Sequence, residues 1–548
     1  MIERASVVGE QFHTADIVAL VPELPALTVE KSLGMLVRQE LIRPDRSPVP
    51  LLPVKEGGSS YRFRHVLTQE TAYNGIAKQV RAGLHERYAT WLESEAGQDR
   101  LSQFDELIGS HLGEAYRYRV ELGFLSDEDR RLAERAGERL AAAGHRAAIR
   151  GNIELTQRLL NRAVELLPEG RPVWLEASLD RADALREAGQ FEEATTVYRN
   201  VCGRATATDD QGVAMHARLG ELDVMAFSGP EELFQQWGTL VKQATILFAE
   251  RGDDLGLAKA RRLKAYMHFA MGQTVEAEKA ARYAIEVARS KGYEHLEAKI
   301  RRLLCIVLFW GPTPLDEVVA YASEALEWAR DQGFPGLEAG ALGILARAEA
   351  MQGSFEEARR LNRSANAITS DLGELLTAAA DSVADGFVEL LADDPAAAEA
   401  KLRVGYEALK EMGGTGPLAN VAAMLARALL VQGHDDEAGQ LTRVCREITA
   451  EKQVDTQSRW RQIQAVILGR RGELHDAKRF ALEAVAMADD SQQPDTRAEA
   501  RMDLAAVLRL AGRPEEGAKR AREALELYEN KGNQVAAGKA RNLLATLA

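Results

Sequence analysis

The sequence predicts an all-α protein, built as a solenoid of about ten helix pairs behind a small N-terminal unit. Turn residues recur about forty residues apart along most of the chain, and such a period is typical of stacked repeat units. A chain of 548 residues is also too long for a single core, because cores stop growing at about 250–300 residues. The recurring turn residues are Gly151, Gly189, Gly229, Gly272, Gly311, Gly353, Gly433, Gly472 and Gly512, with Asp393 where one glycine is missing.

Composition indicates a cytoplasmic protein. The formal net charge of −14 and the pI of about 5.4 disfavour broad binding to nucleic acid or to acidic membranes, which needs a basic face. The N-terminus lacks a secretory signal, and no apolar run approaches the roughly 20 residues of a membrane span. Three widely spaced cysteines, Cys202, Cys305 and Cys445, suit reduced thiols rather than a disulfide or a metal site.

Residues 1–80 have the outline of a small winged-helix unit. Two short helices are expected over 15–24 and 27–39, followed by a strand at Tyr61–Arg64, where rings and guanidinium groups alternate. From His65 onward an apolar stripe at helical spacing predicts a further helix.

The charges on the expected second helix bear on whether this unit binds DNA. Lys31 and Arg38 lie among Glu30 and Glu40, which is a weak pattern for phosphate contact. We therefore expect a structural or regulatory joint, with DNA binding as the less favoured alternative.

Two segments carry a resemblance to a known family. Arg4–Phe12 reads RASVVGEQF and Tyr61–Tyr73 reads YRFRHVLTQETAY. They resemble the winged-helix segment of STAND-class signalling ATPases, many of which are fused to adenylate or guanylate cyclase domains or to LuxR-type DNA-binding domains. In that family helical repeats follow the ATPase, and a winged-helix histidine can face the nucleotide phosphate.

By position, the corresponding residue here is His65, which would bind a cofactor only if an ATPase domain were present. The alternative is a structural histidine whose ring is satisfied by a backbone carbonyl. No G-x-x-x-x-G-K-[ST] string occurs, so the chain departs from the family by lacking the phosphate-binding loop. We expect no cofactor and no metal in this chain.

Residues 81–127 are expected to be a helical linker that includes a helix over 98–113, and residues 128–548 to be the repeat array. A capping helix over 533–547 completes it. The expected pairs are 128–167, 172–204, 209–251, 253–291, 293–332, 335–372, 374–412, 415–451, 455–489 and 494–531.

Small residues follow several of the turns at fixed distances. Alanine stands five residues after the turn at Ala277 and Ala358 and twelve residues after it at Ala284 and Ala365, spacings that let helices approach closely. These offsets resemble the tetratricopeptide repeat, but that repeat is about 34 residues long and closes its second helix with proline. Here a glycine such as Gly292 closes a longer second helix. The resemblance implies a right-handed superhelix with a concave groove, and the forty-residue variant is the one that the signalling ATPases carry.

Six cations are candidates for binding a partner in this groove. Arg261-Arg262 and Arg301-Arg302 lie forty residues apart in consecutive first helices, and Lys264 and Lys299 lie beside them. In register they would form a positive strip able to receive a carboxylate-rich segment or a phosphate. The alternative is that they are solvated and paired with nearby glutamates.

No catalytic constellation is visible, because the sequence contains no H-E-x-x-H, C-x-x-C or G-x-S-x-G string. We therefore expect no enzyme activity from this chain. The favoured function is a protein-interaction or sensor scaffold of a bacterial signalling or transcription-regulatory system, with a protein or peptide partner. The alternative is the C-terminal regulatory part of a larger ATP-binding nucleotide cyclase or ATPase regulator. The sequence does not indicate an oligomeric state.

Overall fold

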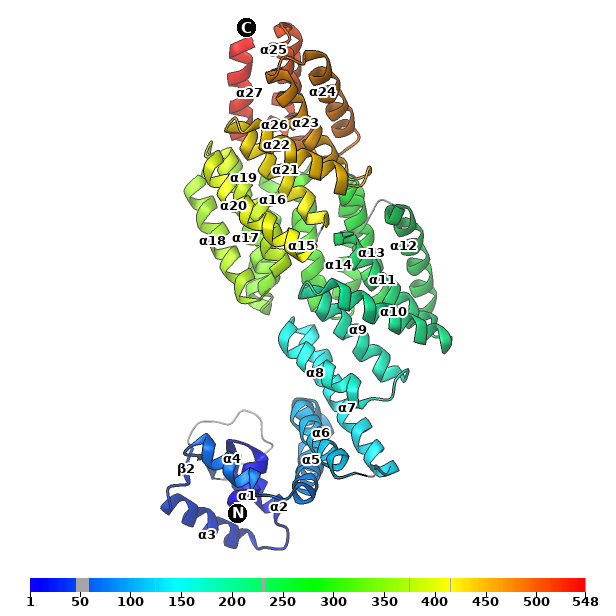
Figure 1. The fold of residues 1–548 in the computed structure, drawn as a ribbon, viewed down its shortest axis with the longest axis vertical. Helices are drawn as coiled ribbons and strands as arrows, with labels where there is room; N and C mark the ends of the chain where they lie inside the picture. The colour runs from blue at the N-terminus through cyan, green and yellow to red at the C-terminus, as the bar shows by residue number, and fades with distance from the viewer. Residues whose placement is uncertain (46–58, 124, 229–231, 374, 414, 548) are drawn as a thin grey trace. The chain divides into compact units, whose positions relative to one another are not determined.

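The computed structural model describes the whole chain except residues 46–58, 124, 229–231, 374, 414 and 548. The described residues form 27 α-helices, one short 3-10 helix and three short strands, mostly as successive antiparallel helix pairs (Figure 1). Contacts divide the chain into a first unit, residues 1–184 with 203–213, and a second unit, residues 185–202 with 214–548. Within the described ranges no helix combines the length and the apolarity that crossing a bilayer requires.

The first unit begins with three helices and a three-stranded sheet. The elements are α1 (Ile2–Val8), β1 (Gln11–His13), α2 (Thr14–Leu20), α3 (Ala26–Arg38), β2 (Ile42–Pro44) and β3 (Ser60–Phe63). The sheet is antiparallel in the order β1-β3-β2. Phe12 of β1 and Phe63 of β3 are buried in one apolar cluster with Ile17 of α2 and Leu33 of α3. The two expected helices and the expected strand occur, although α2 ends at Leu20, four residues before its expected end. α1, β1 and β2 were not expected.

Long helices follow: α4 (Val66–Asn74), α5 (Lys78–Arg100), α6 (Asp105–Leu122), α7 (Asp127–Ile149) and α8 (Ile153–Leu166). The helix expected over 98–113 is wrong in its bounds. The chain breaks in a 3-10 turn at Leu101–Phe104, after Gly97 adopts a left-handed conformation. The break buries Phe104 against Ile108 and lets Asp105 begin a new helix.

The remaining helices match the expected pairs with ends that agree to within about three residues, the usual uncertainty of helix ends. They are α9 (Pro172–Glu187), α10 (Phe191–Ala207), α11 (Gln211–Ser228), α12 (Glu232–Arg251), α13 (Asp254–Ala270), α14 (Thr274–Ser290), α15 (Glu294–Trp310), α16 (Leu315–Gln332), α17 (Pro335–Gln352), α18 (Phe355–Asp371), α19 (Leu375–Leu391), α20 (Pro395–Met412), α21 (Thr415–Val431), α22 (Asp435–Ile448), α23 (Val454–Arg470), α24 (Leu474–Asp489), α25 (Pro494–Leu510), α26 (Pro514–Lys531) and α27 (Gln534–Leu547). The prediction of an all-α repeat fold is confirmed.

The turn residues act as predicted, with one exception. Gly272, Gly353 and Gly433 have φ of 72°, 92° and 83°, and Asp393 takes the same left-handed region with φ 59°. Gly311 instead has φ −76° and an extended backbone, so it ends α15 without a left-handed cap. Gly229 lies outside the described residues.

The alanines after the turns are buried, as close helix contact requires. Ala277, Ala358 and Ala284 are fully buried and Ala365 is 5% exposed.

Gly405 of α20 tests how tightly neighbouring helices pack. A Cβ there would lie 2.0 Å from the Ser382 Oγ and 2.6 Å from the Ala379 carbonyl oxygen of α19. We expect Gly405→Ala to lower the free energy of unfolding by about 2 kcal/mol, because the backbone oxygen cannot move aside alone. Gly343→Ala is the control, since no atom lies within 4 Å of its Cβ. It should gain about 0.5–1 kcal/mol from helix propensity. Equal denaturation midpoints for the two variants would contradict the packing seen here.

Candidate functional site: the inner wall of the second unit

The first helices of successive pairs pack side by side in the second unit. α15 contacts α17, and the series continues through α19, α21 and α23 to α25. Side chains of first helices two or more pairs apart also meet. Such meetings require that the array curve toward this face, because side chains on the outer face of a curved stack diverge. We call this face of the first helices the inner wall.

Opposite charges meet along the inner wall. Arg262 of α13 lies 2.5 Å from Asp223 of α11, and Lys299 of α15 pairs with Glu187 of α9. The other pairs on this wall join Arg302 to Asp381 at 3.7 Å, Arg427 to Asp503 at 2.6 Å and Arg459 to Glu499 at 2.9 Å. The wall therefore carries both signs of charge in a row that runs from α9 to α25.

The six predicted cations do not form one positive strip. Arg262, Lys299 and Arg302 reach the inner wall, where each faces a carboxylate. None of the described ion pairs includes the half-buried Lys264.

Arg261 and Arg301 turn toward the second helices of their pairs. The Arg261 guanidinium lies 4.7 Å from the ring centre of Tyr283, and that of Arg301 lies 4.8 Å from Trp328. Arg301 is buried and its Nε donates to Glu297 at 2.8 Å. Adjacent residues of a helix point about 100° apart, so a basic pair cannot place both side chains on one face.

Sequence reasoning missed the acidic half of this wall. In the sequence nothing distinguished its carboxylates from the other acidic residues of an acidic protein. They include Asp223, Asp381, Glu499 and Asp503. A usable signal existed, because partners lie one to three repeat periods apart: 39 residues for Asp223 and Arg262, 76 for Arg427 and Asp503, and 112 for Glu187 and Lys299.

Aromatic and cationic side chains also meet across the wall. The Arg459 guanidinium of α23 lies 5.6 Å from the ring centre of Trp310 of α15, and Trp310 packs edge-on against Phe387 of α19. Phe387 is buried, so this cluster joins three first helices.

His65 lies exposed at the N-cap of α4, with extended backbone and without a side-chain capping hydrogen bond. It is thus accessible at the start of a helix.

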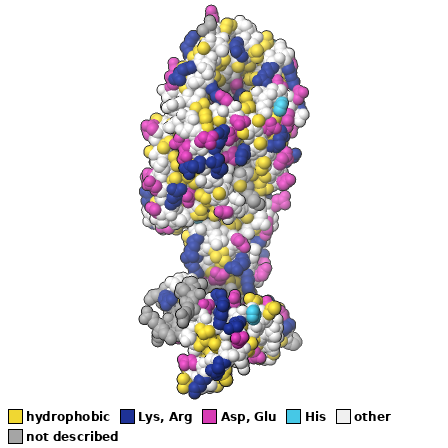
Figure 2. Space-filling model, turned by 90° about the vertical axis from the view of Figure 1, so that its left-hand side faces the viewer, with side chains coloured by type: hydrophobic (Ala, Val, Ile, Leu, Met, Phe, Trp, Pro, Cys, Tyr) yellow, Lys and Arg dark blue, Asp and Glu magenta, His cyan; other side chains and the backbone are white. Residues whose placement is uncertain are grey.

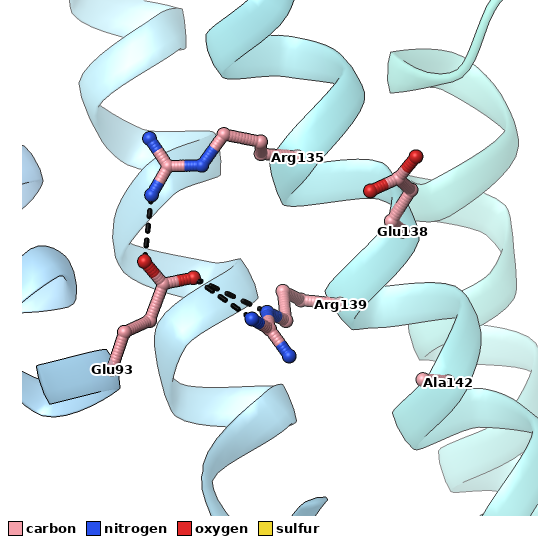
Figure 3. Close-up of a pocket in the computed structure, with 5 residues that line it drawn as sticks. All are labelled: Glu93, Arg135, Glu138, Arg139 and Ala142. Atoms are coloured by element: carbon pink, nitrogen blue, oxygen red, sulfur yellow. Dashed lines mark hydrogen bonds and ion pairs between the residues drawn. The ribbon is translucent and has the colours of Figure 1, made fainter. Parts of the chain in front are cut away.

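The first unit has a small surface pocket of about 230 Å³ between α5 and α7. In Figure 3, Glu93 bridges Arg135 and Arg139, at 2.7 and 3.1 Å. Arg139 also pairs with Asp105 at 3.0 Å. The arginines of this pocket are thus held by carboxylates, and the arrangement fastens α7 to α5 and α6.

The described residues contain no group of three His, Cys, Asp or Glu side chains placed to hold a metal ion. Burial raises the pKa of the Cys305 and Cys445 thiols to about 12, so these two remain protonated at neutral pH.

On the face shown in Figure 2, cations and carboxylates are interspersed.

Asp223 tests the ion pairs of the inner wall. It is buried and lies 2.5 Å from Arg262 and 3.4 Å from Arg186. We expect Asp223→Asn to lower the free energy of unfolding by about 2 kcal/mol, because the partly buried Arg262 loses the carboxylate that it faces and Arg186 keeps only Glu187. Glu221→Gln, whose partner Arg199 is exposed, should cost less than about 1 kcal/mol in the same denaturation assay. A loss at Asp223 no larger than at Glu221 would contradict this view of the wall.

No protein-family model and no curated protein matches the chain. Solved structures do. They include a Rap protein complexed with competence and sporulation factor (16% identity, 68% of this chain and 99% of that chain, TM-score 0.46). A second is the STAND protein with a tetratricopeptide repeat sensor from Pyrococcus horikoshii (14% identity, 100% of this chain and 65% of that chain, TM-score 0.40). A third is the APC/C hetero-tetramer Cut9-Hcn1 (11% identity, 88% of this chain and 99% of that chain, TM-score 0.47). The neighbours are helical-repeat proteins of the tetratricopeptide type.

Proposed function

We propose that the protein is a non-catalytic interaction or sensor scaffold that binds a protein or peptide partner along the inner wall of its repeat array. The observation that carries the proposal is the row of charged side chains from successive first helices. Side chains placed at regular intervals on one continuous face suit an extended segment, whose own side chains also come at regular intervals.

The partner binds by exchange of ion pairs. Arg262, Lys299 and Arg302 are between 19% and 34% exposed in their side chains, so each can turn from its carboxylate to one on the partner. The carboxylates that lose these cations are not left alone in the interior: Arg186 remains 3.4 Å from Asp223 and 3.3 Å from Glu187, and the Asp381 side chain is 31% exposed to water. The cost of exchanging the pairs is therefore low. An acidic partner segment is the form that these three cations favour.

The experiment is capture of partners from an extract of the source cells on immobilised full-length protein. The test variant carries Arg262→Gln, Lys299→Gln and Arg302→Gln. The control carries Arg282→Gln, Arg330→Gln and Arg360→Gln. These three arginines are exposed, and each forms an ion pair with a glutamate of its own helix or of the next helix in the sequence. We expect a partner that wild type and control retain and the test variant loses. A partner retained equally by all three would place binding elsewhere, and no specific partner at all would overturn the proposal.

We further propose a cytoplasmic, bacterial signalling or transcription-regulatory setting, in which residues 1–80 act as a winged-helix joint. The order of helices and strands in this segment, with two strands forming a wing after α3, supports this reading. Glu30 on α3 and Glu40 just after it lie among Lys31 and Arg38, and this mixed charge disfavours a role in reading nucleic acid.

The alternative is a regulatory part of a larger ATPase or nucleotide cyclase, which the exposed His65 at the start of α4 favours. It predicts a phosphate-binding loop encoded in frame upstream of Met1 in the genomic DNA. A stop codon between such a sequence and Met1 would exclude this alternative.

A further inference from the structure

Side chains near the C-terminal end of the second unit complete helix ends far earlier in the chain. Lys531, the last residue of α26, is buried, and its Nζ donates to the carbonyl oxygens of Leu308 at 3.1 Å, Gly311 at 2.8 Å and Thr313 at 2.6 Å. These three acceptors lie at the end of α15 and in the link to α16, 218–223 residues away.

The chemistry of this contact is matched on both sides. The last carbonyls of a helix have no partner within it and carry partial negative charge, and an ammonium has three donors. Burial lowers the pKa of Lys531 to about 8, so the ammonium remains the main form at neutral pH. All three of its protons then have an acceptor.

A second contact caps the start of α14. The Gln492 backbone N–H donates to the Gly272 carbonyl at 2.8 Å, and the Val275 N–H donates to the Gln492 Oε1 at 2.8 Å. The Gln492 Nε2 donates to Glu276 at 3.0 Å. An amide from 217 residues away therefore performs the role of an N-cap.

A third contact involves α27. Lys539 donates to the Leu390 carbonyl at the end of α19, at 3.0 Å, and pairs with Asp393 at 2.6 Å. The same helix packs against α17.

These long-range contacts differ in kind from those between neighbouring helices. The apolar clusters of residues 339–391 and 465–547 each draw on helices that follow one another in the sequence. The three distant contacts consist of hydrogen bonds and an ion pair at single side chains, with small apolar contacts beside them where Leu315 lies against Gly532 and Val535 against Gly353. Polar contacts of this kind exchange with water at little net cost, whereas parting two neighbouring helices exposes apolar surface.

We propose that Gln492, Lys531 and Lys539 form a clasp that holds the second unit in a closed conformation, and that release of the clasp opens the array without unfolding its helix pairs. The clasp joins α24–α27 to α14, α15 and α19. Opening would separate Arg459 from Trp310 and widen the inner wall. The proposal concerns the free protein and holds or fails without any partner.

The test compares two triple variants of the full chain. The clasp variant carries Gln492→Ala, Lys531→Met and Lys539→Met. The control carries Lys519→Met, Gln534→Ala and Arg541→Met, three exposed residues on the same two last helices. Spin labels are placed at Glu317→Cys of α16 and Asn530→Cys of α26, two exposed positions on either side of the Lys531 contact, with Cys202→Ser as background.

We expect the control to keep a single short label distance and the wild-type radius of gyration in small-angle X-ray scattering. The clasp variant should show a longer, broader distance and a larger radius at unchanged helix content by circular dichroism. Unchanged distance and radius would overturn the proposal.

If the triple variant loses helix content, the single variant Lys539→Met takes its place. The Lys539 side chain is 37% exposed and that of its partner Asp393 is 80% exposed, so water can replace the ammonium at this contact. For this variant the labels are moved to Ala396→Cys of α20 and Asn542→Cys of α27, two exposed positions next to the Lys539 contact. The same broadening is expected between them, and its absence would equally overturn the proposal.

Discussion

Acidification from pH 7 to pH 4 is expected to destabilise the first unit by about 3 kcal/mol or more. Two buried histidines of adjacent helices, His85 of α5 and His111 of α6, lie with their Nδ1 atoms 2.8 Å apart. Burial lowers the pKa of His85 to about 4 and that of His111 to about 3, with repulsion between the two rings adding to the effect at His111.

The sign follows from which state takes up protons. The unfolded chain protonates both rings near pH 6.5, while the folded unit keeps them neutral until about pH 4 and 3. The stabilisation is thus complete above pH 6.5 and is lost as pH falls toward 3. One pKa unit corresponds to about 1.4 kcal/mol, which sets the magnitude for His85 alone.

Hydrogen bonds around the pair explain why protonation of either imidazole ring is unfavourable in the folded unit. One direction of donation satisfies every member: Arg81 to the Tyr118 hydroxyl at 3.2 Å, Tyr118 to Tyr73 at 2.9 Å, Tyr73 to the His85 Nε2 at 2.8 Å, and His85 to His111. An added proton on either ring puts a donor where another donor already points. The cations Arg117 and Arg162 oppose it further, and only Glu114 favours it at His85.

The measurement is urea denaturation of the full chain at pH 7, 5.5 and 4, with amide exchange of α5 and α6 reporting on the first unit. The double variant His85→Phe, His111→Phe should lose most of the pH dependence in these helices. The control is His65→Gln, an exposed histidine of the same unit, which should retain it. Equal pH dependence in all three proteins would contradict the prediction.

Removing residues 491–547 is expected to speed amide exchange at the ends of α14 and α15 by at least about tenfold, a loss of about 1.4 kcal/mol of local protection. The deletion takes away Gln492 and Lys531, which complete those helix ends from 217–223 residues away. A stack stabilised only by nearest neighbours would confine the effect to α23 and α24.

A shorter deletion supplies the control. Removing residues 534–547 takes away α27 with Lys539 but leaves Gln492 and Lys531 in place. Exchange should then rise in α17 and α19, which α27 contacts, and stay unchanged at α14 and α15. Exchange at α14 that responds identically to both deletions, or to neither, would contradict the role given to these side chains.

Helices and turns were predictable because their causes are local. A glycine in the left-handed region ends a helix wherever it stands, and alanines at fixed distances behind it bury whether the repeat is the fourth or the ninth. Asp393 shows how strong this constraint is, because the chain takes the left-handed turn there without a glycine. The expected helix at 98–113 failed because a tertiary demand, the burial of Phe104, placed the break.

The candidate site was predictable only in part. Arg262 and Arg302 lie on the expected face, but Arg261 and Arg301 turn away from it, and the carboxylates that face the cations were not foreseen. Helical periodicity gives a side chain's direction around its own helix. It does not give the residue that it meets on another helix.

The sequence by itself thus determined the repeat and the helix ends within it, since these follow from spacing within about forty residues. Only the tertiary structure decided that the inner wall is crossed by ion pairs and that Lys531 reaches the end of α15. The reason is geometric. Whether residues 223 positions apart meet depends on small rotations between neighbouring pairs, summed over more than five repeats, and no local pattern encodes that sum.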